Sequence, residues 1–268
     1  ATQYGTLSIT GYDAATGEIS YSYTLTGSTP DHSDSAANDI IRETIQIAAV
    51  ESDGDIRVDS LVAGVEDDAP MTPAPDTPVS VVEGGAAVGT ANGGDNLLSN
   101  DTLGADGGRV HEITYTDASG NSASVLIPQG GTELVITQYG SLTVASDGTW
   151  SYTPDASADH VKLTNDTELS DDFSYTTIDG DDDVSPGSAT QQITVTDTVP
   201  VLGTPQDASL DEQHLANGSS PDTALREVSG TLDLTPGQDD VNVTFTTDSP
   251  PSGLSSGGVD LVYEVSTD

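Results

Sequence analysis

The residues in this chain that are best able to do chemistry are acidic residues gathered in short runs with glycine. The densest run is residues 179–183, where four aspartates surround Gly180, and residues 53–55 repeat its Asp-Gly-Asp core. Calcium takes about 6–8 oxygen ligands, and loops rich in Asp and Asn with glycine at the sharp turns supply that geometry. Transition metals prefer imidazole or thiolate, but the chain has no cysteine and only four scattered histidines. These runs therefore predict calcium sites.

The charge balance gives the acidic runs a physical reason to bind a divalent ion. The chain has 45 acidic and 5 basic residues, for a formal net charge of −40. Carboxylates held close together repel one another or take up protons unless a cation neutralises them. Because basic side chains are so few, we expect calcium ions to be the neutralising partners. The same charge disfavours nucleic acid as a partner, and the absence of a run of about 18 apolar residues disfavours membrane insertion.

The predicted calcium ligands follow these acidic runs. Residues 179–183 are expected to combine with Asp197 at a junction between modules, and an equivalent set is expected earlier in the chain. Glu83 opens a module just after a linker and is expected to complete a junction site. The alternative for each group is a solvated acidic loop, or Asx turns in the stretch 95–106. The predicted ligands are Asp53, Asp55, Asp67, Asp68, Glu83, Asp95, Asn100, Asp101, Asp106, Asp179, Asp181, Asp183 and Asp197.

The elements that must position these loops are short strands. Apolar and polar residues alternate with a period of two, and turn residues separate the stretches, which is typical of half-buried antiparallel strands. Asp147-Gly148 between two such stretches predicts a hairpin. The pattern predicts an all-β fold of antiparallel β-sandwich modules. The clearest stretches are residues 7–9, 19–23, 134–136, 141–144, 173–176 and 192–195.

An internal repeat sets the expected domain organisation. Several short segments recur at a spacing of about 130 residues, as in tandem arrays. The repeat predicts the second half of one module in 1–70, a complete module in 71–200 and the first half of a third in 201–268. A half sandwich cannot bury its own face. We expect 201–268 to supply the strands that 1–70 lacks, within or between chains; the alternative is that both flanks are loosely held. The matching segments are 3–9 with 138–144, 31–32 with 159–160, 38–39 with 165–166, 53–55 with 179–181, and 65–70 with 195–200.

These segments carry a resemblance to a known family. Residues 94–107 resemble the VLxND…D-G signature of cadherin-like and VCBS-type bacterial repeats, and 173–181 with 193–200 resemble the end of such a module. Residues 52–55 and 67–70 are similar to tandem repeats of giant RTX adhesins exported by type I secretion. The resemblance implies an immunoglobulin-like β-sandwich that serves as an extender at the surface of a Gram-negative cell, stiffened by calcium at its junctions, in attachment and biofilm formation. The GGxGxDxxx series of the RTX β-roll is absent, so no β-roll is expected.

The composition and motifs of the chain also bear on functions other than an extender. A calcium-dependent module for glycan or another surface ligand is the alternative, but aromatic residues make up 4% of the chain and Trp150 is its single tryptophan. Trp150 is expected in the core, and Tyr4 and Tyr139 are expected to pack. His32 and His160, each after an aspartate, are expected in a structural turn or packing contact, and the alternative is a metal or catalytic role. No catalytic motif is visible, so neither an enzyme nor a small-molecule substrate is expected.

Overall fold

The computed structural model describes residues 2–27, 40–156, 168–204 and 209–239, residues 241 and 243, and the backbone of 255–256 and 259–260. Within these residues the fold is all-β, as predicted, with short 3₁₀ turns as its helical elements. The chain divides into two compact units, Ala1–Asp197 and Thr198–Asp268. No helix in the described part is long and apolar enough to cross a bilayer. The predicted repeat pairs at 31–32, 38–39, 159–160 and 165–166, with His32 and His160, lie outside the described residues.

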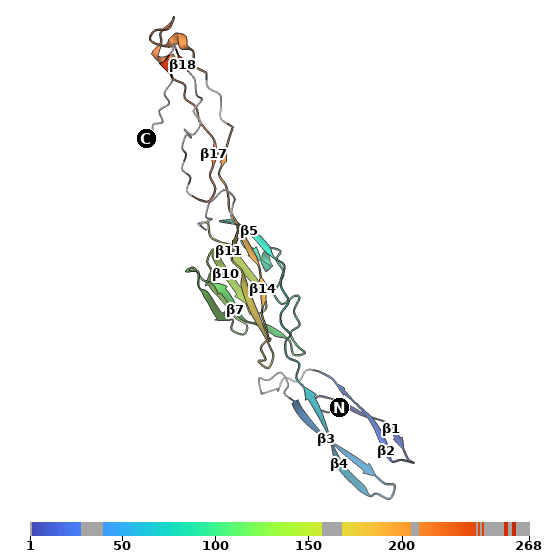
Figure 1. Ribbon diagram of the computed structural model, residues 1–268. Helices are drawn as coiled ribbons and strands as arrows, with labels where there is room; N and C mark the ends of the chain where they lie inside the picture. The colour runs from blue at the N-terminus through green and yellow to red at the C-terminus, as the bar shows by residue number, and fades with distance from the viewer. Residues whose placement is uncertain are drawn as a thin grey trace. The chain divides into compact units, whose positions relative to one another are not determined.

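The first 70 residues form two antiparallel hairpins. They bury little apolar surface: Val65 is the one buried hydrophobic side chain among the described residues of 2–70, whereas Ile9 and Val58 are more than half exposed. This pattern fits the expectation that the segment is part of a larger sandwich. The first hairpin is β1 (Gly5–Asp13) with β2 (Glu18–Leu25), and the second is β3 (Ile40–Val50) with β4 (Ile56–Glu66) (Figure 1).

The following residues, through Asp197, form a β-sandwich of three sheets. One sheet has the order β6 (Val88–Gly89), β11 (Trp150–Pro154), β10 (Gly140–Ala145) and β9 (Thr132–Ile136), and the 3₁₀ turn η1 (Thr90–Asn92) follows β6. The second has the order β14 (Ala189–Gln191), β13 (Phe173–Asp179), β7 (Gly108–Thr116) and β8 (Ser122–Leu126). The third has the order β12 (Leu169–Ser170), β15 (Ile193–Thr196) and β5 (Val79–Val82).

Alternation along these strands builds one hydrophobic core. Leu142 and Val144 of β10 and Ile113 of β7 are fully buried, and their neighbours point to the other face. Trp150 is 3% exposed and meets Phe173 edge to face, with ring centroids 5.8 Å apart. The predictions that Trp150 lies in the core and that Asp147-Gly148 turns the β10–β11 hairpin are therefore confirmed.

One strand pair departs from the antiparallel pattern. β5 runs parallel to β15, with Val79 opposite Ile193. Parallel neighbours need a long connection, and here most of the sandwich lies between the two strands in the sequence. The first and last strands of this module, β5 and β15, are therefore neighbours in one sheet and run in the same direction.

The internal repeat reappears in the hydrogen bonds. In the first segment the Tyr23 hydroxyl donates to Glu43 Oε2 at 2.7 Å, and in the sandwich the Tyr152 hydroxyl donates to Asp171 Oδ2 at 2.6 Å. Both tyrosine rings pack over the glycine that opens the neighbouring strand, β1 or β10. A side chain on either glycine would collide with the ring, which explains why Gly5 recurs as Gly140 in the repeat.

The second unit has little regular structure in its described part. Its strands pair within the unit, β16 with β17 and β18 with β19. The prediction that 201–268 completes the sheets of 1–70 stays a prediction, as do the module boundaries at 70 and 200. The elements are β16 (Val201–Leu202), η2 (Glu212–His214), η3 (Thr223–Leu225), β17 (Leu234–Thr235), β18 (Ser255–Ser256) and β19 (Val259–Asp260).

Candidate metal centre

The acidic run 179–183 forms a tight loop at the end of β13. Asp179 N–H donates to the carbonyl of Asp183 at 3.1 Å, and Asp183 N–H donates to Asp179 Oδ1 at 2.7 Å. Asp182 adopts a φ of 79°, a left-handed conformation that Asp and Asn tolerate better than most residues. These contacts fix Asp179 and Asp183 in the loop and leave Asp182 exposed to solvent.

Asp106 brings a third carboxylate to this loop from the segment that precedes β7. It comes close because β7 pairs with β13, with Gly108 opposite Asp179. Carboxylate oxygens of Asp106, Asp179 and Asp181 lie within 4.8 Å of one another. A Cβ at Gly180 would collide with Asp106 Oδ2, so any larger residue there would displace the Asp106 carboxylate from the loop.

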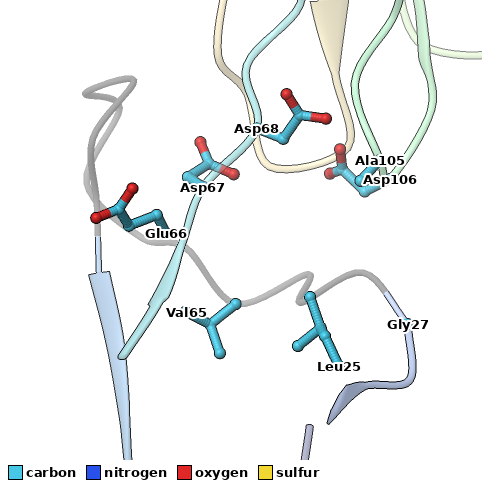
Figure 2. A pocket seen from close by; sticks show the side chains of 8 residues that line it. All are labelled: Leu25, Gly27, Val65, Glu66, Asp67, Asp68, Ala105 and Asp106. Atoms are coloured by element: carbon cyan, nitrogen blue, oxygen red, sulfur yellow. The ribbon is translucent and has the colours of Figure 1, made fainter. Parts of the chain in front are cut away.

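Asp67 and Asp68 reach the same place from the segment that leaves β4. The charge of Asp67 acts on both Asp106 and Asp183, and a Cβ at Gly104 would lie 2.5 Å from the carbonyl oxygen of Asp68. A pocket of about 340 Å³ opens beside them. Figure 2 shows the carboxylates of Asp67, Asp68 and Asp106 on one side of this pocket and the side chains of Leu25 and Val65 on the other. We call Asp67, Asp106, Asp179, Asp181 and Asp183 the junction cluster.

The centre of the junction cluster is buried and lacks compensating partners. Asp179 is 4% exposed and Asp183 is 5% exposed. On four of the five cluster residues, one buried carboxylate oxygen has no hydrogen-bond partner among the described residues, and a buried polar atom without a partner costs free energy. The ion pair that Arg109 forms within the described part of the chain is with the exposed Asp182, with Nη2 3.9 Å from Oδ1. The four atoms are Asp106 Oδ2, Asp179 Oδ2, Asp181 Oδ1 and Asp183 Oδ2.

Burial and mutual repulsion change the acidity of these groups. Burial raises the pKa of Asp179 to about 7, with further contributions from Asp181 and Asp106. Burial, followed by the neighbouring charges, also raises the pKa values of Asp183 and Asp106. Near neutral pH the cluster must therefore hold protons, bear unfavourable charge or bind a cation.

A divalent cation fits the donors of the cluster. Ligands about 2.3–2.6 Å from one calcium ion lie at most about 5 Å apart, and the 4.8 Å limit on the three carboxylates agrees with this. A hollow of about 320 Å³ borders Asp106 and Asp179, with room for several waters of about 30 Å³ each. The residues present thus match a hard, oxygen-liganded ion in donor type and in the spacing of three carboxylates.

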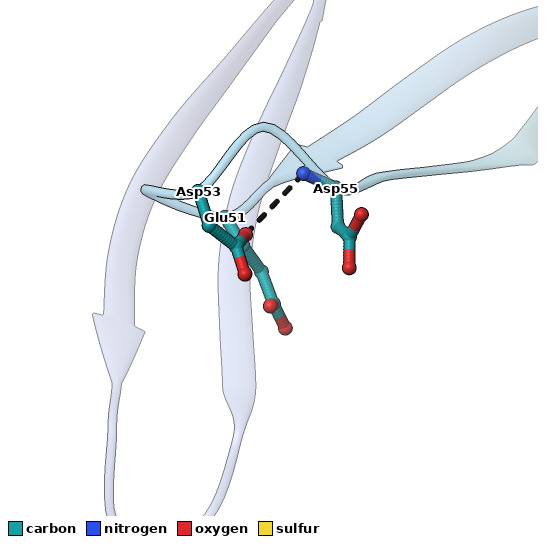
Figure 3. A group of neighbouring side chains, drawn as sticks. All are labelled: Glu51, Asp53 and Asp55. Carbon is teal, nitrogen blue, oxygen red and sulfur yellow. Dashed lines mark hydrogen bonds between the residues drawn. The ribbon is translucent and has the colours of Figure 1, made fainter.

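The first Asp-Gly-Asp run lies elsewhere. Asp53 and Asp55 are in the exposed turn between β3 and β4, where they form a group with Glu51; the Asp55 N–H donates to Asp53 Oδ1 at 3.4 Å (Figure 3). The 11 residues of β4 separate this turn from Asp67 and Asp68. The structure therefore does not bring the four predicted ligands of the first segment together.

Asp197 is also not at the junction cluster. β13 and β14 are antiparallel, with Phe173 opposite Gln191, so the chain after Gln191 runs away from Asp179. Asp197 instead lies near Glu83, because the Glu83 N–H donates to the carbonyl of Thr196 at 3.0 Å. These two predicted ligands mark the other end of the sandwich.

The predicted group at 95–106 divides into two places. Asp106 joins the junction cluster, whereas Asp95 and Asp101 lie around Asp76, which the sequence did not single out. Asn100 donates from Nδ2 to the carbonyl of Pro75 at 3.0 Å and is exposed, so its amide ties two segments together. Asp76 sits in a Pro-rich stretch that has the composition of a linker, and its burial is a tertiary property that no local pattern reveals.

The sequence comparisons identify no relatives for this chain. A scan against protein-family models found no match, and a search of curated proteins found no similar sequence.

Proposed function

We propose that this chain is a calcium-stiffened spacer segment of a long extracellular protein, in which an ion ties the exit of one β-sandwich module to the next. The observation that carries this proposal is the junction cluster. Its ligands come from both sides of a repeat boundary, because Asp67 belongs to the exit of the first segment and the other four aspartates belong to the following sandwich.

An ion in this position has a mechanical consequence. A flexible string of modules gains end-to-end length only as about the square root of its number of residues, whereas stiff junctions make reach proportional to module number. An ion held by both sides of a junction restricts rotation there. Extracellular calcium modules bind at about 10⁻⁴–10⁻³ M, so such a chain is stiff outside the cell.

The repeat and the resemblance described above extend the proposal to an extender of a surface adhesin of a Gram-negative cell. The recurring Tyr-acid contacts of Tyr23 and Tyr152 support tandem modules of one kind. The glycan-binding alternative has no comparable support, since Trp150 is buried in the core and cannot stack on a sugar.

Chelation tests the proposal on the chain as it exists. We expect EDTA to lower the melting temperature and to broaden the distance distribution in small-angle X-ray scattering, and excess calcium to restore both. A ligand that binds only the folded state stabilises it by about 2.7 kcal/mol at about 100 times its Kd.

Two variants in the same loop provide a matched comparison. Asp181→Asn removes a charge from the cluster, and Asp182→Asn removes one from its exposed neighbour, where Asn also tolerates the positive φ. Asp181→Asn should lose the part of the calcium-dependent gain that the junction cluster supplies, and Asp182→Asn should keep all of it. Equal responses, or no response to chelator in the parent chain, would refute the proposal.

A further inference from the structure

We infer that Asp76, with Asp101 and Asp95, forms a second divalent-cation site inside the sandwich, which fastens the segment 71–78 to the loop 95–102. This site shares no residue with the junction cluster. The ligand class is a hard cation such as calcium, held by carboxylate oxygens. The inference does not depend on a role at module junctions, so the two sites can succeed or fail separately.

The first observation is an acid buried without a partner. Asp76 is 7% exposed, yet among the described residues neither of its carboxylate oxygens has a hydrogen-bond partner. Burying a charge in this way is costly unless an opposite charge accompanies it. The charges facing Asp76 are those of Asp101 and Asp95, which add repulsion.

The hydroxyl of Tyr175 reaches Asp76 as well as two other acceptors, so it cannot satisfy all of them. It has one proton, and its oxygen lies 2.7 Å from the carbonyl oxygen of Leu97 and 3.2 Å from Asp101 Oδ2. A proton given to either of these acceptors leaves Asp76 without a donor. Tyr175 stays protonated and uncharged beside the site, because burial, followed by the charges of Asp76 and Asp101, raises its pKa.

Hydrogen bonds hold the acids in place around this point. Asp101 Oδ1 accepts the N–H of Ala74 at 2.8 Å, and Asp95 Oδ2 accepts the hydroxyl of Thr77 at 3.0 Å. Each acid thus uses one oxygen to bind the segment that carries Asp76. Asp95 Oδ1 remains for an ion, and so does Asp101 Oδ2 when the Tyr175 proton goes to the carbonyl of Leu97. A site whose ligands are already oriented loses less entropy on binding.

Burial and the neighbouring acids make an unaccompanied charge on Asp76 costly. Burial raises its pKa to about 6, and Asp101 and Asp95 contribute to the rise. No described residue offers its carboxylate a positive charge. Carboxylate oxygens are the kind of ligand that calcium takes.

The sandwich contains its own reporter for this site. Trp150 is the single tryptophan, and its Nε1–H donates to the backbone carbonyl of Asp95 at 2.9 Å. An ion bound through Asp95 therefore acts on the residue that contacts the indole. Trp150 should report on this site by its emission, and it should sensitise terbium, which replaces calcium at oxygen sites.

The experiment uses the full chain stripped of divalent ions and titrated with calcium, with terbium as a second probe. Trp150 emission and terbium luminescence follow the Asp76 site, and calorimetry counts all sites. The variants are Asp76→Asn and, for the junction cluster, Asp181→Asn. We expect Asp76→Asn to weaken the Trp150-reported binding at least tenfold and to remove one calorimetric site. Asp181→Asn should leave the Trp150 signal unchanged.

The outcomes separate the two sites. A Trp150 response that is unchanged in Asp76→Asn, or lost in Asp181→Asn, overturns the inference, as does a parent chain whose Trp150 signals are unchanged by both ions. Should Asp76→Asn fail to fold, Asp95→Asn replaces it, because Asp95 is exposed and its backbone contact to Trp150 stays. That variant should weaken the reported binding several-fold, and an unchanged affinity overturns the inference equally.

Discussion

The chain contains two copies of one acidic turn, and they differ in what surrounds them. At 51–55 the acids are exposed at the tip of a two-stranded hairpin, and at 179–183 the equivalent acids are packed into a cluster. Both copies follow a strand and share the Asp-Gly-Asp core. The difference is that the second copy meets Asp106, from the segment before β7, and Asp67, from the preceding repeat.

This comparison shows that the acidic turn alone does not make a binding site. In the exposed copy each carboxylate is solvated, and water screens the repulsion between them. In the buried copy Asp179 and Asp183 lose water, and their pKa values rise. Burial by the neighbouring segments therefore makes the charge of this turn costly unless a proton or a cation accompanies it.

The largest expected difference between the two copies is in calcium affinity. Asp179→Asn keeps the acceptor for the Asp183 N–H but removes a charge from the cluster, so we expect calcium binding by calorimetry to weaken more than about tenfold, or about 1.4 kcal/mol. The matched change Asp53→Asn should weaken it less than about twofold. Equal losses would show that the exposed turn binds as well as the buried one.

Substituting the glycine of each turn should also affect calcium binding differently, but by a smaller factor. A Cβ at Gly180 would collide with Asp106, so Gly180→Ala should weaken calcium binding several-fold. Gly54 has a φ of 102°, and a Cβ added there would have no atom within 4 Å, so Gly54→Ala should cost stability by about 1–2 kcal/mol and leave calcium affinity unchanged. Calorimetry and thermal melts of both variants measure this, and a calcium defect in Gly54→Ala would contradict it.

The pH dependence should separate the metal-free chain from the calcium-bound one. The folded-state pKa of Asp179 is raised from 3.8 to about 7, and that of Asp76 is raised from 3.8 to about 6. Between pH 3.8 and about 7, the folded chain therefore binds more protons than the unfolded chain. Stability of the metal-free chain should therefore rise as pH falls from about 7 to about 4.

Calcium should oppose this trend, because protons compete with the ion for the same oxygens. Thermal melts across this pH range, with EDTA or with excess calcium, measure both slopes. In the metal-free Asp179→Asn variant, the rise in stability between about pH 7 and about pH 4 should be smaller than in the parent chain. A metal-free chain whose stability falls steadily over the same range would contradict the raised pKa values.

The smallest expected contrast involves the two repeated tyrosine-acid pairs. Tyr152 and Asp171 are buried, so Tyr152→Phe removes a hydrogen bond in the core and should cost about 1–2 kcal/mol in the free energy of unfolding. Tyr23 bonds to Glu43 near the surface, and Tyr23→Phe should cost less than about 1 kcal/mol. Denaturant melts measure both, and a larger loss for Tyr23→Phe would indicate that the first segment is more tightly packed than the described contacts imply.

Much of this arrangement follows from local sequence. The alternation of apolar and polar residues predicts the strands, and Asp147-Gly148 predicts its hairpin because only a few residues accept that turn. The all-β class follows from both. The parallel pairing of β5 with β15 does not, since it joins the two ends of the module and depends on how the whole sandwich closes.

The grouping of the predicted ligands could not be predicted from the sequence. Residues 95–106 are close in sequence, but Asp106 lies next to the start of β7 and so reaches Asp179, while Asp95 and Asp101 remain with Asp76. Strand direction carries Asp197 to the opposite end. The sequence therefore identified the acidic residues, but the strand pairing of the folded chain determines which of them lie close together.

The most direct measurement is anomalous X-ray diffraction from crystals grown with calcium. The account predicts an anomalous peak about 2.3–2.6 Å from carboxylate oxygens of Asp106, Asp179 and Asp181, with Asp67 or Asp183 in its coordination shell. Density for water alone at that position, in the presence of millimolar calcium, would contradict it.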